Sequence, residues 1–142
     1  MKQKGFTLME LLVVMSIISL LASVVMSTLK VARNKARFAQ VVTEMVSIAK
    51  AGNMDYSENG SYSPEVAAGV APSFVPGLLG VWPTAPCAGW KYDWENSPAP
   101  YVGVVLRDAA SAAIYSLCLD ESVCTGAIND VRADTSRSFE CH

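Results

Sequence analysis

A single carboxylate lies within an apolar segment near the start of the chain. Residues 6–29 contain no Lys, Arg, Asp or Pro, and Glu10 is their one charged residue. A charged side chain at the centre of a bilayer costs about 2.5–3.5 kcal/mol on insertion scales, and less near the edge. Glu10 therefore needs a cationic partner that its own segment does not supply, so we expect this carboxylate to be functional.

The segment that carries Glu10 is predicted to begin one long helix. No Gly or Pro interrupts residues 6–51, and apolar side chains recur at helical spacing beyond residue 30. Residues 6–29 would span about 36 Å as a helix, which is enough to cross a bilayer. Residues 30–53 are amphipathic and therefore have a surface to pack against. Gly52 and Asn53 are the expected end of the helix.

The chain begins with a short basic leader followed by the run Lys4-Gly5-Phe6-Thr7-Leu8-Met9-Glu10-Leu11-Leu12-Val13-Val14. This run closely resembles the class III signal of type IV prepilins and of the pseudopilins of type II secretion. The resemblance covers residues 1 to about 50. It implies that a prepilin peptidase cuts between Gly5 and Phe6 and then N-methylates Phe6. It also implies that Glu10 pairs with the free amine of a neighbouring subunit, which would fix the axial stagger of a filament because charge pairing is strong at low dielectric constant.

Two other readings of the N-terminal segment compete with this resemblance. The segment could be an ordinary secretory signal that is cut after a small residue such as Ala22, or an uncleaved signal anchor. Both leave the energetic penalty of Glu10 unexplained. The chain also departs from the family at Ser27, where many pilins carry a proline at which the helix can melt in filaments.

The resemblance implies an α+β pilin fold, in which one long N-terminal helix packs against a small antiparallel sheet. We expect a leader at 1–5, a helix at 6–53 with a transmembrane or filament-core part at 6–29 and an amphipathic part at 30–53, and a globular head at 54–142. Short aromatic and β-branched runs predict strands at 90–94, 101–106 and 113–119, with hairpin connections at 97–100 and 108–111. A last strand after Cys124 would make the sheet four-stranded. The Asn59-Gly60 pair predicts a turn between helix and head.

Charge is unevenly distributed. A basic neck of +4 follows the apolar segment and consists of Lys30, Arg33, Lys35 and Arg37. Residues 51–142 hold four bases and eleven acids, a net charge of −7. Such a head is a poor surface for nucleic acid, whereas the neck could touch anionic lipid. The positive-inside rule would place the head in the cytoplasm, but the resemblance implies an inner-membrane precursor that becomes an extracellular or periplasmic filament.

All four cysteines lie in the predicted head, at Cys87, Cys118, Cys124 and Cys141. An even number in a small extracytoplasmic domain predicts two disulfides, and each could contribute about 2–4 kcal/mol. The spacing leaves all three pairings open. It does not match a zinc site, because Cys118 and Cys124 lack the usual close spacing and the one histidine is His142.

Other chemistry finds little support. The chain has no phosphate loop and no nucleophile elbow, so we expect no enzymatic activity. Major pseudopilins hold calcium in a C-terminal loop, and this region here contains Asp120, Glu121, Asp130 and Asp134. Their spacing matches no fixed calcium loop, so no metal and no cofactor is expected.

The aromatic residues at 82–101 suit core or subunit contacts, or stacking on sugars. We expect Trp90 and Trp94 on one strand face and Tyr92 on the other.

These features together predict a structural subunit of a type IV pilus-like filament that serves adhesion, motility or surface attachment. Its implied partners are other copies of the chain, the prepilin peptidase, an assembly ATPase, a platform protein and, before assembly, the membrane. One alternative is a pseudopilin of a type II secretion system or of a DNA-uptake pseudopilus. A second alternative, from another class, is a monomeric membrane-tethered binding domain outside the cytoplasm.

Overall fold

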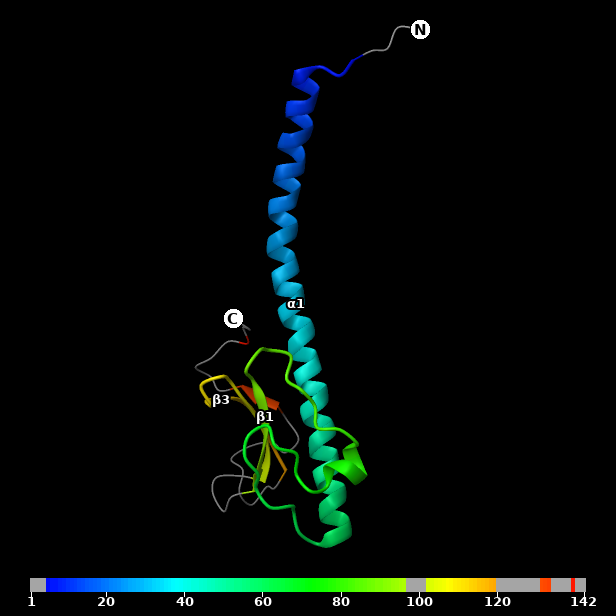
Figure 1. Ribbon diagram of the computed structural model, residues 1–142, viewed down its shortest axis with the longest axis vertical. Coiled ribbons are helices and arrows are strands. Elements are labelled where there is room, and N and C mark those ends of the chain that lie inside the picture. Colours follow the sequence, from blue (N-terminus) through cyan, green and yellow to red (C-terminus); the bar gives the residue numbers. More distant parts are fainter. Residues whose placement is uncertain (1–4, 97–101, 120–130, 134–138, 140–142) are drawn as a thin grey trace. The chain divides into compact units, whose positions relative to one another are not determined.

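The structure, a computed structural model, describes residues 5–96, 102–119, 131–133 and 139, with residues 131–133 described by their backbone alone. Its elements are α1 (Leu8–Asn59), the π-helix η1 (Val75–Leu79) and the strands β1 (Lys91–Asn96), β2 (Val102–Arg107), β3 (Ala113–Cys118) and β4 (Val131–Ala133). The long N-terminal helix and the antiparallel sheet confirm the predicted α+β arrangement (Figure 1). The chain divides into two compact units, Met1–Ala36 and Arg37–His142.

The first unit consists, in its described part, of the N-terminal portion of α1. Every large apolar side chain from Leu8 to Leu29 is exposed within the single chain. The helix forms because this stretch lacks Gly and Pro and is rich in Leu and Met. No described residue covers its apolar surface, so its stability in this region depends on a surrounding membrane or on other helices.

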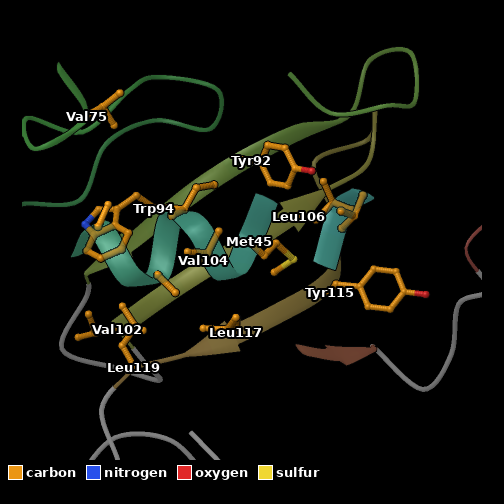
Figure 2. Close-up of a cluster of buried hydrophobic side chains, with 14 of the residues drawn as sticks. Met45, Val75, Tyr92, Trp94, Val102, Val104, Leu106, Tyr115, Leu117 and Leu119 are labelled. Atoms are coloured by element: carbon orange, nitrogen blue, oxygen red, sulfur yellow. The ribbon is translucent and has the colours of Figure 1, made fainter. Parts of the chain in front are cut away.

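The second unit is built by packing the sheet on α1. Val41, Met45 and Ile48 are spaced at three and four residues and are completely buried. Figure 2 shows Met45 among sheet residues such as Tyr92, Val104 and Leu106, with Tyr115 and Leu117 nearby. Because the helix presents one apolar face and the sheet another, the two elements form a two-layer core.

The sheet has the order β1-β2-β3-β4, and each neighbouring pair is antiparallel. Its first three strands agree with the predicted ones to within one or two residues, and β4 is the short last strand. Asp108 Oδ1 shapes the turn between β2 and β3 by accepting hydrogen bonds from the backbone N–H groups of Ala110 and Ala112, both at 2.9 Å. The predicted connection at 97–100 lies outside the described residues.

The predicted split of the aromatic residues between two strand faces is wrong. Tyr92 and Trp94 are both buried in the core cluster between sheet and helix, and Trp90 is packed against the same cluster. Residues two positions apart in a strand point to the same face. These three aromatic side chains therefore share one side of β1.

The helix ends at Asn59 rather than near Asn53. Gly52 lies inside the helix, where the missing side chain lets the backbone approach the indole of Trp94. A Cβ at this position would lie 2.4 Å from Trp94 Cη2. The true end is Gly60, whose φ of 72° is left-handed and whose N–H donates to Tyr56 O at 2.8 Å. This is the usual glycine termination of a helix, so the Asn59-Gly60 signal marks the cap itself.

A buried carboxylate fastens the chain that follows the helix. Asp55 Oδ2 accepts hydrogen bonds from the N–H and Oγ of Ser63, at 3.1 and 2.7 Å. The carbonyl of Ser63 in turn accepts from Trp94 Nε1 at 3.0 Å and from Asn96 Nδ2 at 2.8 Å. Helix, connection and first strand are thereby held at one point.

Candidate functional site

The predicted cleavage site lies just before the helix. Gly5, Phe6 and Thr7 precede α1 and adopt no regular structure. Phe6 is 82% exposed, and no heavy atom lies within 4 Å of the place where a Cβ on Gly5 would be. A peptidase needs an accessible, non-helical bond, and the bond between Gly5 and Phe6 meets both conditions. Lys2 and Lys4 of the leader lie outside the described residues.

Thr7 and Glu10 form a capping box at the start of α1. Glu10 N donates to Thr7 Oγ1 at 3.3 Å, while the N–H and Oγ1 of Thr7 both donate to Glu10 Oε2 at 2.9 Å. This reciprocal arrangement satisfies backbone donors that the first helical turn leaves free. Sequence reasoning missed this role of Thr7, although the pattern Thr-x-x-Glu before an apolar run is its usual signature.

The second carboxylate oxygen of Glu10 is not used by the cap. Both bonds from Thr7 end on Oε2, and among the described residues no base forms an ion pair with Glu10. The glutamate is also exposed within the single chain. The cap therefore holds the side chain near the helix start and leaves Oε1 available for a further donor.

The helix behind this cap is apolar enough to cross a membrane. An 18-residue window of α1 has a mean hydropathy of 2.5, and none of its residues is buried within the chain. Exposed apolar surface of this extent indicates a membrane or a partner. This interpretation as a possible membrane span depends on the length and composition of the helix.

Four hydroxyl groups inside the apolar segment are satisfied locally. Ser19, Ser23 and Ser27 donate to carbonyl oxygens one turn earlier, at 2.8–2.9 Å, and Thr28 does so at 3.0 Å. Hydroxyls bonded in this way can enter an apolar environment without an unpaired donor. The helix is continuous at Ser27 in this structure.

The described cysteines are oxidised. Cys87 and Cys118 are disulfide-bonded, and no free cysteine occurs in the described part of the chain. Cys124 and Cys141 lie outside the described residues. The pairing therefore stays open.

The metal-binding prediction depends on residues outside the described ranges. Asp120, Glu121, Asp130 and Asp134 are all among them. Within the ranges described above, no group of three or more His, Cys, Asp or Glu side chains is placed to hold a metal. The expectation of a chain without metal or cofactor stays a prediction.

One ion-pair cluster lies on the sheet face opposite the aromatic core. Arg107 pairs with both Asp93 and Glu95. Burial, followed by the neighbouring Asp93, raises the pKa of Glu95, although Arg107 opposes the shift. The arrangement cross-links β1 and β2, so we assign it a structural role.

The comparison with protein families identifies the N-terminal segment. Residues 1–26 match the family model described as the prokaryotic N-terminal methylation motif. The chain therefore carries a class III signal peptide of the type IV pilin and pseudopilin kind, as predicted from residues 4–14. That motif belongs to structural subunits rather than to enzymes. Together with the apolar helix it fits a membrane-anchored precursor that becomes part of an extracellular filament.

A second comparison gives a partial match of a different kind. A stretch of 93 residues is 31% identical to polyprotein P1234 of Eastern equine encephalitis virus (strain Florida 91-469), and it covers 59% of this chain and 4% of the polyprotein. The chain thus spans a small fraction of that relative, and the similarity shows no shared family. No solved structure matches the chain.

Proposed function

We propose that this protein is the structural subunit of a type IV pilus-like filament. The observation that carries the proposal is the match of residues 1–26 to the methylation motif, at the start of a helix whose apolar side chains from Leu8 to Leu29 are not covered by any described residue. Removal of residues 1–5 would create a new amine at Phe6. Packing of residues 6–50 from many copies would then cover the apolar surface that the single chain exposes.

The capping box supports a specific role for Glu10 in assembly. Because Oε2 is held by Thr7, the carboxylate is oriented and Oε1 can accept the amine at Phe6 of a neighbouring copy. Pairing at low dielectric constant is strong, and an unpaired charge in the apolar core is costly. A filament would then be stable in one axial register, in which each carboxylate meets an amine.

The machine that handles the subunit follows from the same proposal. A prepilin peptidase would cleave after Gly5 and methylate Phe6, and an assembly ATPase acting through a platform protein would extract the subunit from the membrane. We propose adhesion, motility or surface attachment as the use of the filament. Catalysis is not part of the proposal.

Substitution of Glu10 tests this function. Glu10→Ala removes both charge and cap, whereas Glu10→Gln keeps an acceptor for Thr7 and removes the charge. Both variants should be cleaved and reach the membrane, yet both should be absent from sheared filaments. Ser16→Ala, a small change in the same helix, is the matched control and should assemble.

The outcomes separate the alternatives. Wild-type amounts of Glu10→Ala or Glu10→Gln in filaments would overturn the proposed role of the charge. A chain that never forms filaments, and is unaffected by either change, would be a tethered binding domain. Loss of protein export rather than of surface filaments in a deletion strain would identify a secretion pseudopilin.

A further inference from the structure

Most of the connection between α1 and β1 is uncharged. Segment 66–90 contains no Asp, Glu, Lys, Arg or His, although residues 51–142 as a whole carry a net charge of −7. This connection and the start of β1 together form a groove of about 510 Å³. A volume of this size lies in the range of small-molecule sites.

Aromatic rings and one cation line the groove. Trp82 and Trp90 contribute indole rings, Thr84 a hydroxyl and Lys91 an ammonium group. None of the described lining residues is acidic. Lys91 is exposed, and its ammonium group forms no hydrogen bond or ion pair with any described residue. Arg107, by contrast, is already paired with two carboxylates.

The wall of the groove is held in place by the backbone. Gly69 N donates to Tyr92 O at 2.8 Å, and Gly69 has a φ of 84°, which a side chain would strain. A Cβ on Gly69 would also lie 3.0 Å from Lys91 Cδ. The glycine therefore lets the lysine stem lie against the connection, so the position of the stem is restricted before any ligand arrives.

One polar group at the groove lacks a partner. Trp82 Nε1 is buried, and no described residue offers it a hydrogen-bond acceptor. A buried donor without an acceptor costs about 1–3 kcal/mol. The indole ring lines the groove, so a ligand oxygen near this N–H would supply the missing acceptor.

We propose that this groove binds an acidic saccharide, with a sugar ring against the indoles and a carboxylate at Lys91. The C–H face of a sugar suits an aromatic surface, its oxygens suit Trp82 Nε1, and its carboxylate suits the one unpaired base at the groove. The net negative charge of the head repels a long polyanion such as a nucleic acid. A short oligomer of uronic acids brings only a few negative charges near the head. The site is additional to the assembly role of Glu10 and does not depend on it.

Binding is tested on the full chain in lauryldimethylamine oxide, a detergent without a sugar headgroup. The probe is trigalacturonate, its methyl ester is the uncharged control, and tryptophan fluorescence is the readout. Trigalacturonate should cause a saturable change, whereas the methyl ester should bind about fivefold or more weakly because it lacks the charges that Lys91 would pair with.

Variants locate the site. Lys91→Ala should weaken binding about fivefold or more and Lys91→Arg should retain it, whereas Lys50→Ala, at an exposed lysine of α1 outside the groove, should have no effect. Trp82→Phe keeps a ring and removes the N–H, and should weaken binding about tenfold with the far-UV spectrum unchanged.

Three results would overturn the proposal. The first is no saturable change with trigalacturonate. The second is equal affinity for the methyl ester or for a single-stranded oligonucleotide of the same charge. The third is a fluorescence change that depends on protein concentration alone and disappears in Lys91→Ala, which would make the groove a contact between copies of the chain.

Discussion

At the scale of single residues, Gly52 sets how closely helix and sheet approach. A Cβ there would lie 2.4 Å from Trp94 Cη2 and 2.8 Å from Trp94 Cζ3. Trp94 is completely buried and bonded to Ser63 O, so its ring has little room to move. The role of Gly52 is therefore steric, which its place before Asn53 in the sequence does not reveal.

We expect Gly52→Ala to lower the free energy of unfolding by about 1–3 kcal/mol through overpacking. Denaturant unfolding followed by tryptophan fluorescence measures this change. Gly77→Ala is the matched control, because nothing lies within 4 Å of its Cβ position, and it should stay within about 0.5 kcal/mol of the wild type. Equal stability of the two variants would contradict the close approach.

A second residue-scale prediction concerns Tyr92, whose hydroxyl donates to Glu44. Burial first, and then the hydrogen bond to Glu44 and its charge, raise the pKa of Tyr92 above its ordinary value of 10.0. A raised pKa in the folded state means that ionising the phenol opposes folding. The contribution of the protonated Tyr92 phenol to the free energy of unfolding is complete below pH 10 and is lost as the pH rises further.

The free energy of unfolding should therefore fall above pH 10, and Tyr92→Phe should make that fall shallower. Tyr56→Phe is the control, since Tyr56 is 48% exposed and should leave the slope unchanged. Unfolding curves between pH 8 and 11.5 supply the measurement. An unchanged slope in Tyr92→Phe would show that this phenol does not contribute.

At the scale of elements, the end of α1 is coupled to the connection through Asp55. This carboxylate is buried and accepts hydrogen bonds from Ser63 N, Ser63 Oγ and Asn59 Nδ2. Ser63 Oγ also lies 2.9 Å from Ser73 Oγ. One side chain thus orders two points of the connection.

Asp55→Ala should destabilise the second unit by about 1–3 kcal/mol, because it leaves the buried N–H of Ser63 without its acceptor. Amide exchange should rise at Ser63 and at neighbouring residues of the connection, and hydrogen-exchange mass spectrometry detects this. Glu58→Ala, at an exposed acid in the last turn of the helix, should leave exchange unchanged. Exchange that rises equally in both variants would contradict the coupling.

Elements were easier to predict than their ends and partners. β1, β2 and β3 were predictable because each is a short apolar run between turn-forming residues, and the helix because residues 6–51 lack Gly and Pro. Gly52 was misread as a stop because a close-approach glycine and a capping glycine look alike in sequence. The true cap at Gly60 depends on its left-handed φ, and the Asp55–Ser63 contact joins residues whose pairing follows no periodic pattern.

At the scale of the whole molecule, two kinds of surface require other partners. The N-terminal part of α1 exposes apolar side chains that no described residue covers, whereas the second unit buries a core of its own. The methylation motif at residues 1–26 and the Thr7–Glu10 cap lie at the start of the exposed helix. We therefore expect a precursor that is stable in a membrane and a processed subunit that is stable in a filament.

The most direct test of that account is the N-terminal sequence and intact mass of the protein in sheared extracellular filaments. The account predicts a chain that starts at Phe6, carries one added methyl group and lacks the hydrogens that two disulfides remove. A chain that still starts at Met1, or that is cut near Ala22, would contradict it.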